Sequence, residues 1–193
     1  MTKAADVLVI GGGMAGISAG ARLAEAGLAV TVLEREAAIG RHATGRSAAM
    51  YIPSYGNAAL RALIAAGTDV MLEPGALAET ALTSPRGMML VASVAELPAF
   101  EATLAEPNGM ERITPEEARA WVPVLRAEAV AAAARDPAAM ALDVDLMLQG
   151  FARALRAAGG QVVTGAEVRG IVRQGGAWAI ETAAGTFSAP VVV

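Results

Sequence analysis

The first 34 residues alternate between short apolar runs and one helix-forming segment. Residues 6–10 form a β-branched apolar run, glycines occupy 11–13, and residues 15–26 carry helix formers up to Gly27. A second apolar run follows at residues 29–33. Strand, turn, helix and strand in this order predict a βαβ unit, and such a crossover implies a parallel sheet. We therefore expect a doubly wound, Rossmann-like α/β fold.

The middle of the chain is less regular. Residues 35–56 are mostly small or polar, which predicts a loop too long for an ordinary connection unless it binds a ligand. Beyond this loop, the pattern predicts helices over 57–73 and 96–105, a strand over 88–92, and a helix with its capped start at Thr114. Residues 127–134 fit either a short helix or a strand, and both alternatives stay open.

The last 51 residues change from helical to strand patterns. Asp143 is placed to cap a helix that ends at Ala158, and a strand over 161–164 follows. Apolar and polar residues then alternate across glycine turns, which predicts a three-stranded antiparallel meander over 168–172, 178–182 and 186–188. Residues 190–193 resemble the opening of a further buried strand, without a cap or polar tail, so we expect the N-terminal part of a longer protein.

Composition excludes several classes of protein. The chain is 55% hydrophobic with a net charge of −4, which indicates a globular protein without the basic surface that nucleic acid or an anionic membrane requires. Cysteine is absent, so disulfides, thiolate metal sites and a cysteine nucleophile are excluded, and no other pattern indicates a metal. No apolar run approaches the ~20 residues of a membrane span, and the first run is too short for a secretory signal. We expect a cytoplasmic protein.

The segment from Gly11 to Gly16 has the spacing of a dinucleotide-binding turn. Gly11 permits the tight turn, Gly13 lets a pyrophosphate approach the backbone, and Gly16 allows close packing of helix on strand. Met14 and Ala15 complete this turn, and the helix start supplies free N–H groups for phosphates. Glu34 ends the second strand, where a carboxylate can accept hydrogen bonds from a ribose and repel a 2′-phosphate. These features predict binding of a dinucleotide other than NADP.

The loop after Glu34 distinguishes FAD from NAD. It reads Arg35-Glu36-Ala37-Ala38-Ile39-Gly40-Arg41-His42-Ala43-Thr44-Gly45-Arg46-Ser47-Ala48-Ala49-Met50. With Ser84-Pro85-Arg86 and Val122-Pro123-Val124-Leu125-Arg126, it resembles the D-amino-acid oxidase type of FAD-dependent oxidoreductases, and within that family the D-arginine and D-amino-acid dehydrogenases. The resemblance covers the chain from end to end. It implies that FAD is the cofactor and that this loop wraps the pyrophosphate.

The resemblance also implies individual site residues. The cofactor contacts that it adds to the glycine turn and Glu34 are Arg35, His42, Ala43, Thr44, Gly45, Arg46, Ser47, Ala48 and Val168. His42 is the only histidine; it is expected to form hydrogen bonds or simply to pack, and a covalent flavin link, known in some relatives, is the less favoured alternative. Tyr55 occupies an active-site position of the family and is expected to position substrate.

Two departures from the D-arginine dehydrogenases bear on the substrate. Met50 and Met88 stand where those enzymes have a histidine and the glutamate that receives the cationic side chain. A thioether offers an adaptable apolar wall instead of a charged partner. We therefore expect an amino acid or amine with an apolar or neutral side chain.

The expected organisation is one FAD-dependent oxidoreductase region over 4–193. Within it, residues 4–50 form the dinucleotide-binding βαβ unit and flavin loop, 51–142 begin the substrate or cap region, and 143–193 return to the FAD-binding domain. The expected reaction is hydride transfer from the α-carbon of the substrate to the flavin, and the resulting imine is hydrolysed. No catalytic base is visible, and neither is the electron acceptor. Two alternatives stay open, namely a non-catalytic FAD-binding fragment or half of a split flavoenzyme with a partner chain, and a Rossmann-type NAD protein.

Overall fold

The computed structural model describes residues 3–106 and 108–193, and the chain forms two compact units. The first unit contains the chain up to Ala48 together with Pro74–Thr80 and Asp143–Val193. The second contains Ala49–Glu73 and Ala81–Leu142. The first unit is therefore assembled from both ends of the chain and one short segment from its middle, and the rest of the middle forms the second unit.

A parallel sheet forms the centre of the first unit. Its strands lie in the order β10 (Gln161–Val163), β3 (Val30–Leu33), β2 (Val7–Ile10) and β14 (Val191–Val192), and all neighbours are parallel. Helix α1 (Met14–Glu25) connects β2 to β3 and is followed by Gly27, whose φ is +89°. Every residue of β3 is buried, as parallel strands covered on both faces require. The predicted βαβ unit and parallel sheet are confirmed.

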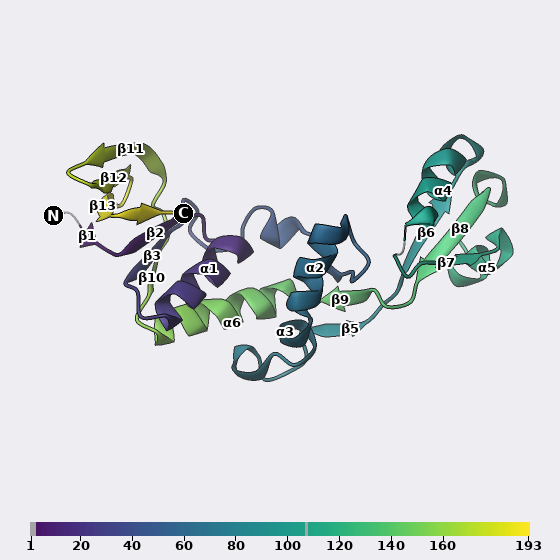
Figure 1. Cartoon of the computed structure of the whole chain (residues 1–193), viewed down its shortest axis with the longest axis horizontal. Coiled ribbons are helices and arrows are strands. Elements are labelled where there is room, and N and C mark those ends of the chain that lie inside the picture. Colours follow the sequence, from purple (N-terminus) through teal and green to yellow (C-terminus); the bar gives the residue numbers. More distant parts are fainter. Residues whose placement is uncertain (1–2, 107) are drawn as a thin grey trace. The chain divides into compact units, whose positions relative to one another are not determined.

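Helix α6 (Val144–Ala157) packs along α1 in the first unit (Figure 1). The Asp143 side chain accepts a hydrogen bond of 2.8 Å from the Leu146 N–H, so the predicted cap is confirmed. Gly20 of α1 lies between the sheet and α6: a Cβ there would meet Val32 of β3 at a tight 3.1 Å and Leu155 of α6 at an ordinary 3.6 Å. The helix pair therefore packs directly on the sheet.

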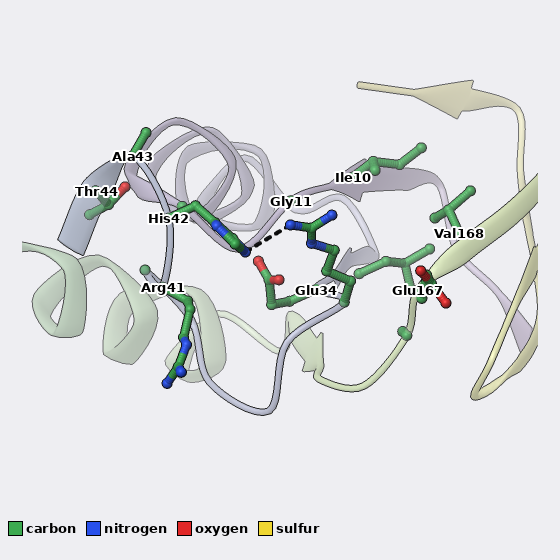
Figure 2. Close-up of a pocket in the computed structure, with 14 residues that line it drawn as sticks. Ile10, Gly11, Glu34, Arg41, His42, Ala43, Thr44, Glu167 and Val168 are labelled. Carbon is green, nitrogen blue, oxygen red and sulfur yellow. Dashed lines mark hydrogen bonds between the residues drawn. The ribbon is translucent and has the colours of Figure 1, made fainter. Parts of the chain in front are cut away.

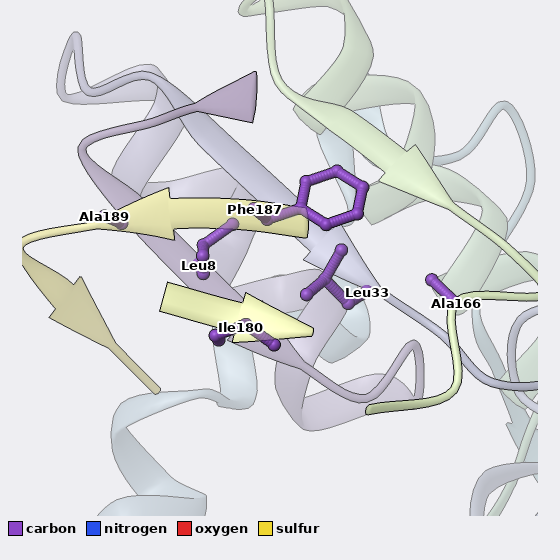
Figure 3. Close-up of a cluster of buried hydrophobic side chains, with 6 residues drawn as sticks. All are labelled: Leu8, Leu33, Ala166, Ile180, Phe187 and Ala189. Atoms are coloured by element: carbon purple, nitrogen blue, oxygen red, sulfur yellow. The ribbon is translucent and has the colours of Figure 1, made fainter. Parts of the chain in front are cut away.

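A second sheet of the first unit contains the predicted meander. Its order is β1 (Lys3–Ala4), β13 (Gly185–Ala189), β12 (Ala177–Thr182) and β11 (Val168–Gln174), and β12 is antiparallel to both β13 and β11. Strand β1 pairs parallel with β13. It was not predicted because two residues carry no periodicity. A buried cluster unites the two sheets of this unit (Figure 3), consisting of Leu8, Leu33, Ala166, Ile180, Phe187 and Ala189.

The second unit consists of two small antiparallel sheets and short helices. One sheet has the order β4 (Met50–Tyr51), β9 (Met140–Leu142), β5 (Thr83–Pro85), and the other the order β6 (Met88–Ala92), β8 (Ala132–Asp136), β7 (Glu111–Ile113). The helices are α2 (Ala58–Ala66), α3 (Thr68–Leu72), α4 (Leu97–Ala105) and α5 (Pro115–Trp121). Single 3₁₀ turns lie at Thr44–Arg46 and Gly75–Leu77 in the first unit, and at Val94–Glu96 and Ala127–Ala129 in the second. Thr114 forms the predicted capping box with Glu117 at the start of α5.

Two predictions were wrong in part. Residues 57–73 form two helices, because the first ends at Gly67, and glycine is among the poorest residues for a helix interior. Residues 190–193 do supply a parallel strand, but Val191 and Val193 are 48% and 60% exposed because β14 lies at the edge of the sheet. For the open segment 127–134, the structure has a 3₁₀ turn followed by strand β8. None of the helices in the described ranges is long and apolar enough to cross a membrane.

Candidate functional site

The glycine turn between β2 and α1 has a backbone that only glycine adopts readily. Gly11 has a φ of +109°, in the region that L-residues rarely occupy. A Cβ on Gly16 would lie 2.0 Å from the Gly11 carbonyl oxygen and 3.2 Å from the Val9 side chain, so this position must be glycine for the helix to approach the strand. Both geometric tasks expected of these two glycines are thus present in the structure. A Cβ on Gly13 would meet the Thr44 hydroxyl oxygen at 3.1 Å.

Glu34 is buried beside the glycine turn and is held by backbone donors. One carboxylate oxygen accepts a 2.7 Å hydrogen bond from the Gly12 N–H, and the other accepts a 2.8 Å bond from the Glu36 N–H. Only 7% of Glu34 is exposed. A carboxylate offers about four lone-pair sites, so accepting these two bonds leaves capacity for ribose hydroxyls. The two hydrogen bonds also fix the orientation of the Glu34 carboxylate.

The loop after β3 is fastened to the glycine turn by its own backbone. Gly40 N–H donates to the Gly12 carbonyl at 3.0 Å, and Gly45 N–H donates to the Gly40 carbonyl at 2.7 Å. The Thr44 hydroxyl accepts a 2.9 Å bond from the Met14 N–H, the first amide of α1. This bond satisfies one of the amides that a helix start leaves without an intrahelical partner. The loop therefore closes over the helix start in a defined geometry.

These segments line an open cavity of about 440 Å³ in the first unit (Figure 2). Its lining comprises Ile10, Gly11, Gly13, Leu33, Glu34, Arg35, Gly40, Arg41, His42, Ala43, Thr44, Ala166, Glu167 and Val168. Leu33 and Ala166 also belong to the buried cluster that unites the two sheets, so the core supplies part of the cavity wall. The volume lies within the range of ligand pockets in proteins.

Three charged or ionisable side chains interact at the rim of this cavity. His42 Nε2 lies 2.7 Å from a carboxylate oxygen of Glu36 and 2.9 Å from a guanidinium nitrogen of Arg35. The hydrogen bond from His42, and next the positive charges of His42, Arg35 and Arg41, hold the pKa of Glu36 below its ordinary value. These contacts give His42 a hydrogen-bonding role in the structure.

The residues around the cavity fit the diphosphate and ribose of a dinucleotide. Gly13 carries no Cβ at the start of α1, where the helix dipole and the remaining first-turn N–H groups favour an anion. Glu34 directly follows β3, and its carboxylate keeps lone pairs free for hydroxyl groups. Arg35 and Arg41 add positive charge to the lining. The N–H groups and arginines therefore suit an anion, and the Glu34 carboxylate suits the hydroxyl groups of a neighbouring sugar.

The structure brings together only some of the cofactor contacts that the sequence predicts. Eight of them line the cavity, namely Gly11, Gly13, Glu34, Arg35, His42, Ala43, Thr44 and Val168. The others lie outside its lining: Met14, Ala15 and Gly16 in α1, and Gly45, Arg46, Ser47 and Ala48 further along the loop. The role of all fifteen residues as cofactor contacts stays a prediction.

Sequence reasoning missed several residues of the lining. These are Ile10, Leu33, Gly40, Arg41, Ala166 and Glu167. Ile10 and Leu33 end the two central strands, and ligands bind beyond the carboxyl ends of parallel strands, so this signal was available. Ala166 and Glu167 come from the segment before β11, whose approach to the Glu34 loop depends on the fold: Ala166 N–H donates to the Glu34 carbonyl at 2.8 Å.

The three residues expected to contact substrate belong to the second unit. Tyr55 lies in the turn between β4 and α2 and is 62% exposed. Met50 is the first residue of β4 and Met88 the first residue of β6, so they belong to different sheets, and both are half-buried. Within residues 3–106 and 108–193, no cluster of three or more His, Asp or Glu side chains is placed to hold a metal ion.

Comparison with known proteins places this site in a family. The model of the DAO family, described as FAD dependent oxidoreductase, matches residues 6–193. Among solved structures, glycine oxidase from Geobacillus kaustophilus is similar with a TM-score of 0.81 and 24% identity, covering 99% of this chain and 55% of that one. L-α-glycerophosphate oxidase from Mycoplasma pneumoniae, solved with FAD bound, has a TM-score of 0.81 and 18% identity, with 99% and 53% covered. L-proline dehydrogenase from P. horikoshii has a TM-score of 0.79 and 22% identity, with 100% and 52% covered. The chain thus spans about half the length of these structures.

Proposed function

The chain belongs to the family of FAD-dependent oxidoreductases, whose cofactor is FAD, and on this premise we propose that the protein oxidises the C–N bond of an amino acid or amine. The observation that carries the proposal is the family match, which extends over residues 6–193 and so includes the whole glycine turn, Glu34 and the loop that closes over them. The family match argues against the alternative of a Rossmann-type NAD protein.

The first unit has the task of holding the cofactor. FAD supplies the hydride acceptor of such a reaction. The start of α1 and the glycine turn receive the diphosphate, and Glu34 accepts from ribose hydroxyls while its charge disfavours a 2′-phosphate. The Arg35–Glu36–His42 cluster borders the same cavity, and its hydrogen bonds hold these side chains together at the rim. These residues of the first unit bind and orient the cofactor. Contacts to the reacting atoms of the substrate come from other parts of the protein.

The substrate that we propose has an apolar or neutral side chain. Neutral thioethers at Met50 and Met88 favour this class, because a binding site for a guanidinium or ammonium group needs a paired carboxylate. Tyr55 offers an exposed ring and hydroxyl, which suit it to position such a molecule. Glycine oxidase and L-proline dehydrogenase share this fold and are named for amino acids with neutral side chains, which supports the choice.

Spectroscopy of the purified protein tests the proposal. We expect flavin absorbance bands, which anaerobic addition of D-methionine or D-leucine bleaches, with glycine as a small neutral substrate and D-arginine as the cationic control. Preferential bleaching by D-arginine would contradict the assignment of Met50 and Met88. Bleaching only by sn-glycerol 3-phosphate would place the chemistry at a C–O bond, as in the oxidase of M. pneumoniae, and refute C–N oxidation.

A second candidate function is an FAD-binding module that needs a partner chain for catalysis. It is supported by the cavity of the first unit, because every residue of its lining belongs to that unit and none to the second. Strand β14 also leaves an apolar sheet edge, and such an edge favours association with another strand. Flavin bands that none of the four amino acids nor sn-glycerol 3-phosphate bleaches would favour this module over the enzyme.

A further inference from the structure

The turn that carries Tyr55 combines a fixed backbone with an exposed side chain. The Tyr55 N–H donates to the Ile52 carbonyl at 3.1 Å, and Gly56 next to it has a φ of +79°. Asn57 then caps α2, accepting a 3.0 Å bond from the Leu60 N–H. The Tyr55 side chain is nevertheless 62% exposed. Its own packing therefore does not explain why the turn is held.

A buried carboxylate of strand β8 holds this turn. Asp136 is 2% exposed, and one of its oxygens accepts a 2.6 Å hydrogen bond from the Ser54 hydroxyl, directly before Tyr55. Its other oxygen accepts a 2.9 Å bond from the Ala138 N–H. Burying a carboxylate is costly unless it is hydrogen-bonded, and hydrogen bonds to a charged acceptor are among the stronger ones. The Ser54–Asp136 bond thus joins positions 82 residues apart in the sequence.

The same carboxylate lies beside the second residue proposed to contact substrate. Asp136 is the register partner of Met88 in the β6–β8 pair. Through Ser54 it therefore connects the turn of Tyr55 to the strand pair that begins with Met88. A single buried group thus links two segments that each carry a side chain proposed to contact substrate.

We infer that Asp136 is a positioning residue, which acts through Ser54 to hold Tyr55 in place for the substrate. The inference rests on the proposed function, because it takes Tyr55 as a substrate contact. Holding the turn in advance removes the entropy cost of ordering it when substrate binds. Loss of the tether therefore weakens substrate binding more than it slows turnover.

The test compares Ser54→Ala with Ser54→Thr, which keeps a hydroxyl. The control Ser93→Ala removes a similar hydroxyl–carboxylate bond, the 2.7 Å bond from Ser93 to Glu96 in the same unit. Hydrogen exchange reports the Tyr55 amide in this chain. Steady-state kinetics of the full-length protein uses whichever of glycine, D-methionine, D-leucine and D-arginine is oxidised with the highest kcat/KM.

We expect Ser54→Ala to speed exchange of the Tyr55 amide about tenfold and to raise KM about tenfold with kcat nearly unchanged, which corresponds to one charge-assisted hydrogen bond. Ser54→Thr restores both values, and Ser93→Ala changes neither. Unchanged exchange in Ser54→Ala overturns the inference. So does a raised KM in Tyr55→Ala that Ser54→Ala fails to reproduce.

The outcomes separate the tether from the proposed function. If Tyr55→Ala leaves KM unchanged, the substrate role of Tyr55 is refuted and the inference with it, whatever the exchange rates show. If none of the amino acids is oxidised, C–N oxidation is refuted, and exchange at Tyr55 still decides whether Asp136 holds the turn. Equal losses in kcat and melting temperature for Ser54→Ala and Ser93→Ala would indicate a purely structural bond and overturn the inference.

Discussion

The two units of the chain differ in how completely their helices bury apolar surface. In the first unit, strand β3 is buried along its whole length and the helices α1 and α6 pack directly on the sheet. In the second, helix α2 is almost wholly apolar yet contains no buried residue, and Leu63 is 72% exposed. Both units bury apolar clusters, around Leu8 in the first and around Phe100 and Ala118 in the second, but α2 of the second unit presents apolar surface to solvent.

The difference extends to the chemistry of the two units. Around the cavity of the first unit, backbone groups and missing Cβ atoms set the geometry, as at Gly11 and Gly16. In the second unit, single polar side chains hold the connections, as Asp136 and the capping box at Thr114 do. A glycine-built binding site follows from backbone geometry, whereas a site made from side chains depends on which residues the fold brings together. The first can be recognised from a short motif, and the second cannot.

Truncating a buried residue of the first unit and an exposed residue of the second tests this contrast most strongly. Leu155→Ala removes a side chain that is 0% exposed in α6, and we expect a loss of about 4 kcal/mol in the free energy of unfolding, the transfer and cavity terms together. Leu63→Ala in α2 removes an exposed side chain, and we expect a change within about 0.5 kcal/mol. Urea denaturation followed by circular dichroism measures both. Similar losses in the two variants would show that α2 is buried in solution and contradict the comparison.

The next largest effect is expected at the glycine turn. Gly16→Ala places a Cβ 2.0 Å from the Gly11 carbonyl oxygen, and we expect a loss of about 3 kcal/mol in stability together with loss of FAD binding. Gly170→Ala is the matched control, because its Cβ would meet its nearest neighbour at an ordinary 3.5 Å. Quenching of flavin fluorescence during titration measures binding. Wild-type affinity in Gly16→Ala would show that the close helix–strand approach is dispensable.

Removing the Glu34 carboxylate is expected to have a smaller effect. Glu34→Ala leaves the buried Gly12 N–H without its acceptor, and we expect a loss of about 2 kcal/mol in the free energy of unfolding. We also expect FAD to bind about thirtyfold more weakly, because the same carboxylate is proposed to accept from the ribose hydroxyls. Glu25→Gln, at an exposed ion pair of α1 with Arg22, serves as the control and should change stability by less than about 1 kcal/mol. Isothermal titration with FAD gives the affinities, and unchanged affinity in Glu34→Ala would remove Glu34 from the site.

The smallest expected effect is a shift in titration at the rim of the cavity. Because its folded-state pKa is lowered from 4.5, Glu36 contributes stability above that pH, and this contribution is lost as pH falls through the lowered pKa. We expect His42→Ala, which removes the main cause, to move the pKa of Glu36 back toward 4.5. Carboxyl NMR titration measures this, with Glu96 as the internal control, since hydrogen bonds from Ser93 lower its pKa. An unchanged pKa of Glu36 in His42→Ala would show that the contact between His42 and Glu36 is not formed in solution.

Much of the first unit was determined by the sequence alone. The period of apolar residues, the glycine spacing and the acid at the end of the second strand are local features, and local sterics and hydrogen bonding are enough to specify a βαβ unit with its turn. The meander and the Asp143 cap were predictable for the same reason. The family and its cofactor FAD followed from the loop after Glu34, and the family match confirms them.

Only the tertiary structure decided which distant segments meet. Ala166 and Glu167 join the cavity because β10 pairs with β3 and brings the following segment to the Glu34 loop. The bond from Ser54 to Asp136 joins residues 82 positions apart, and the pattern of apolar and polar residues does not predict such a contact. The exposure of β14 likewise depends on its place at the sheet edge, since an apolar run looks the same in a central and an edge strand. Local patterns specify elements, and the packing of those elements specifies neighbours.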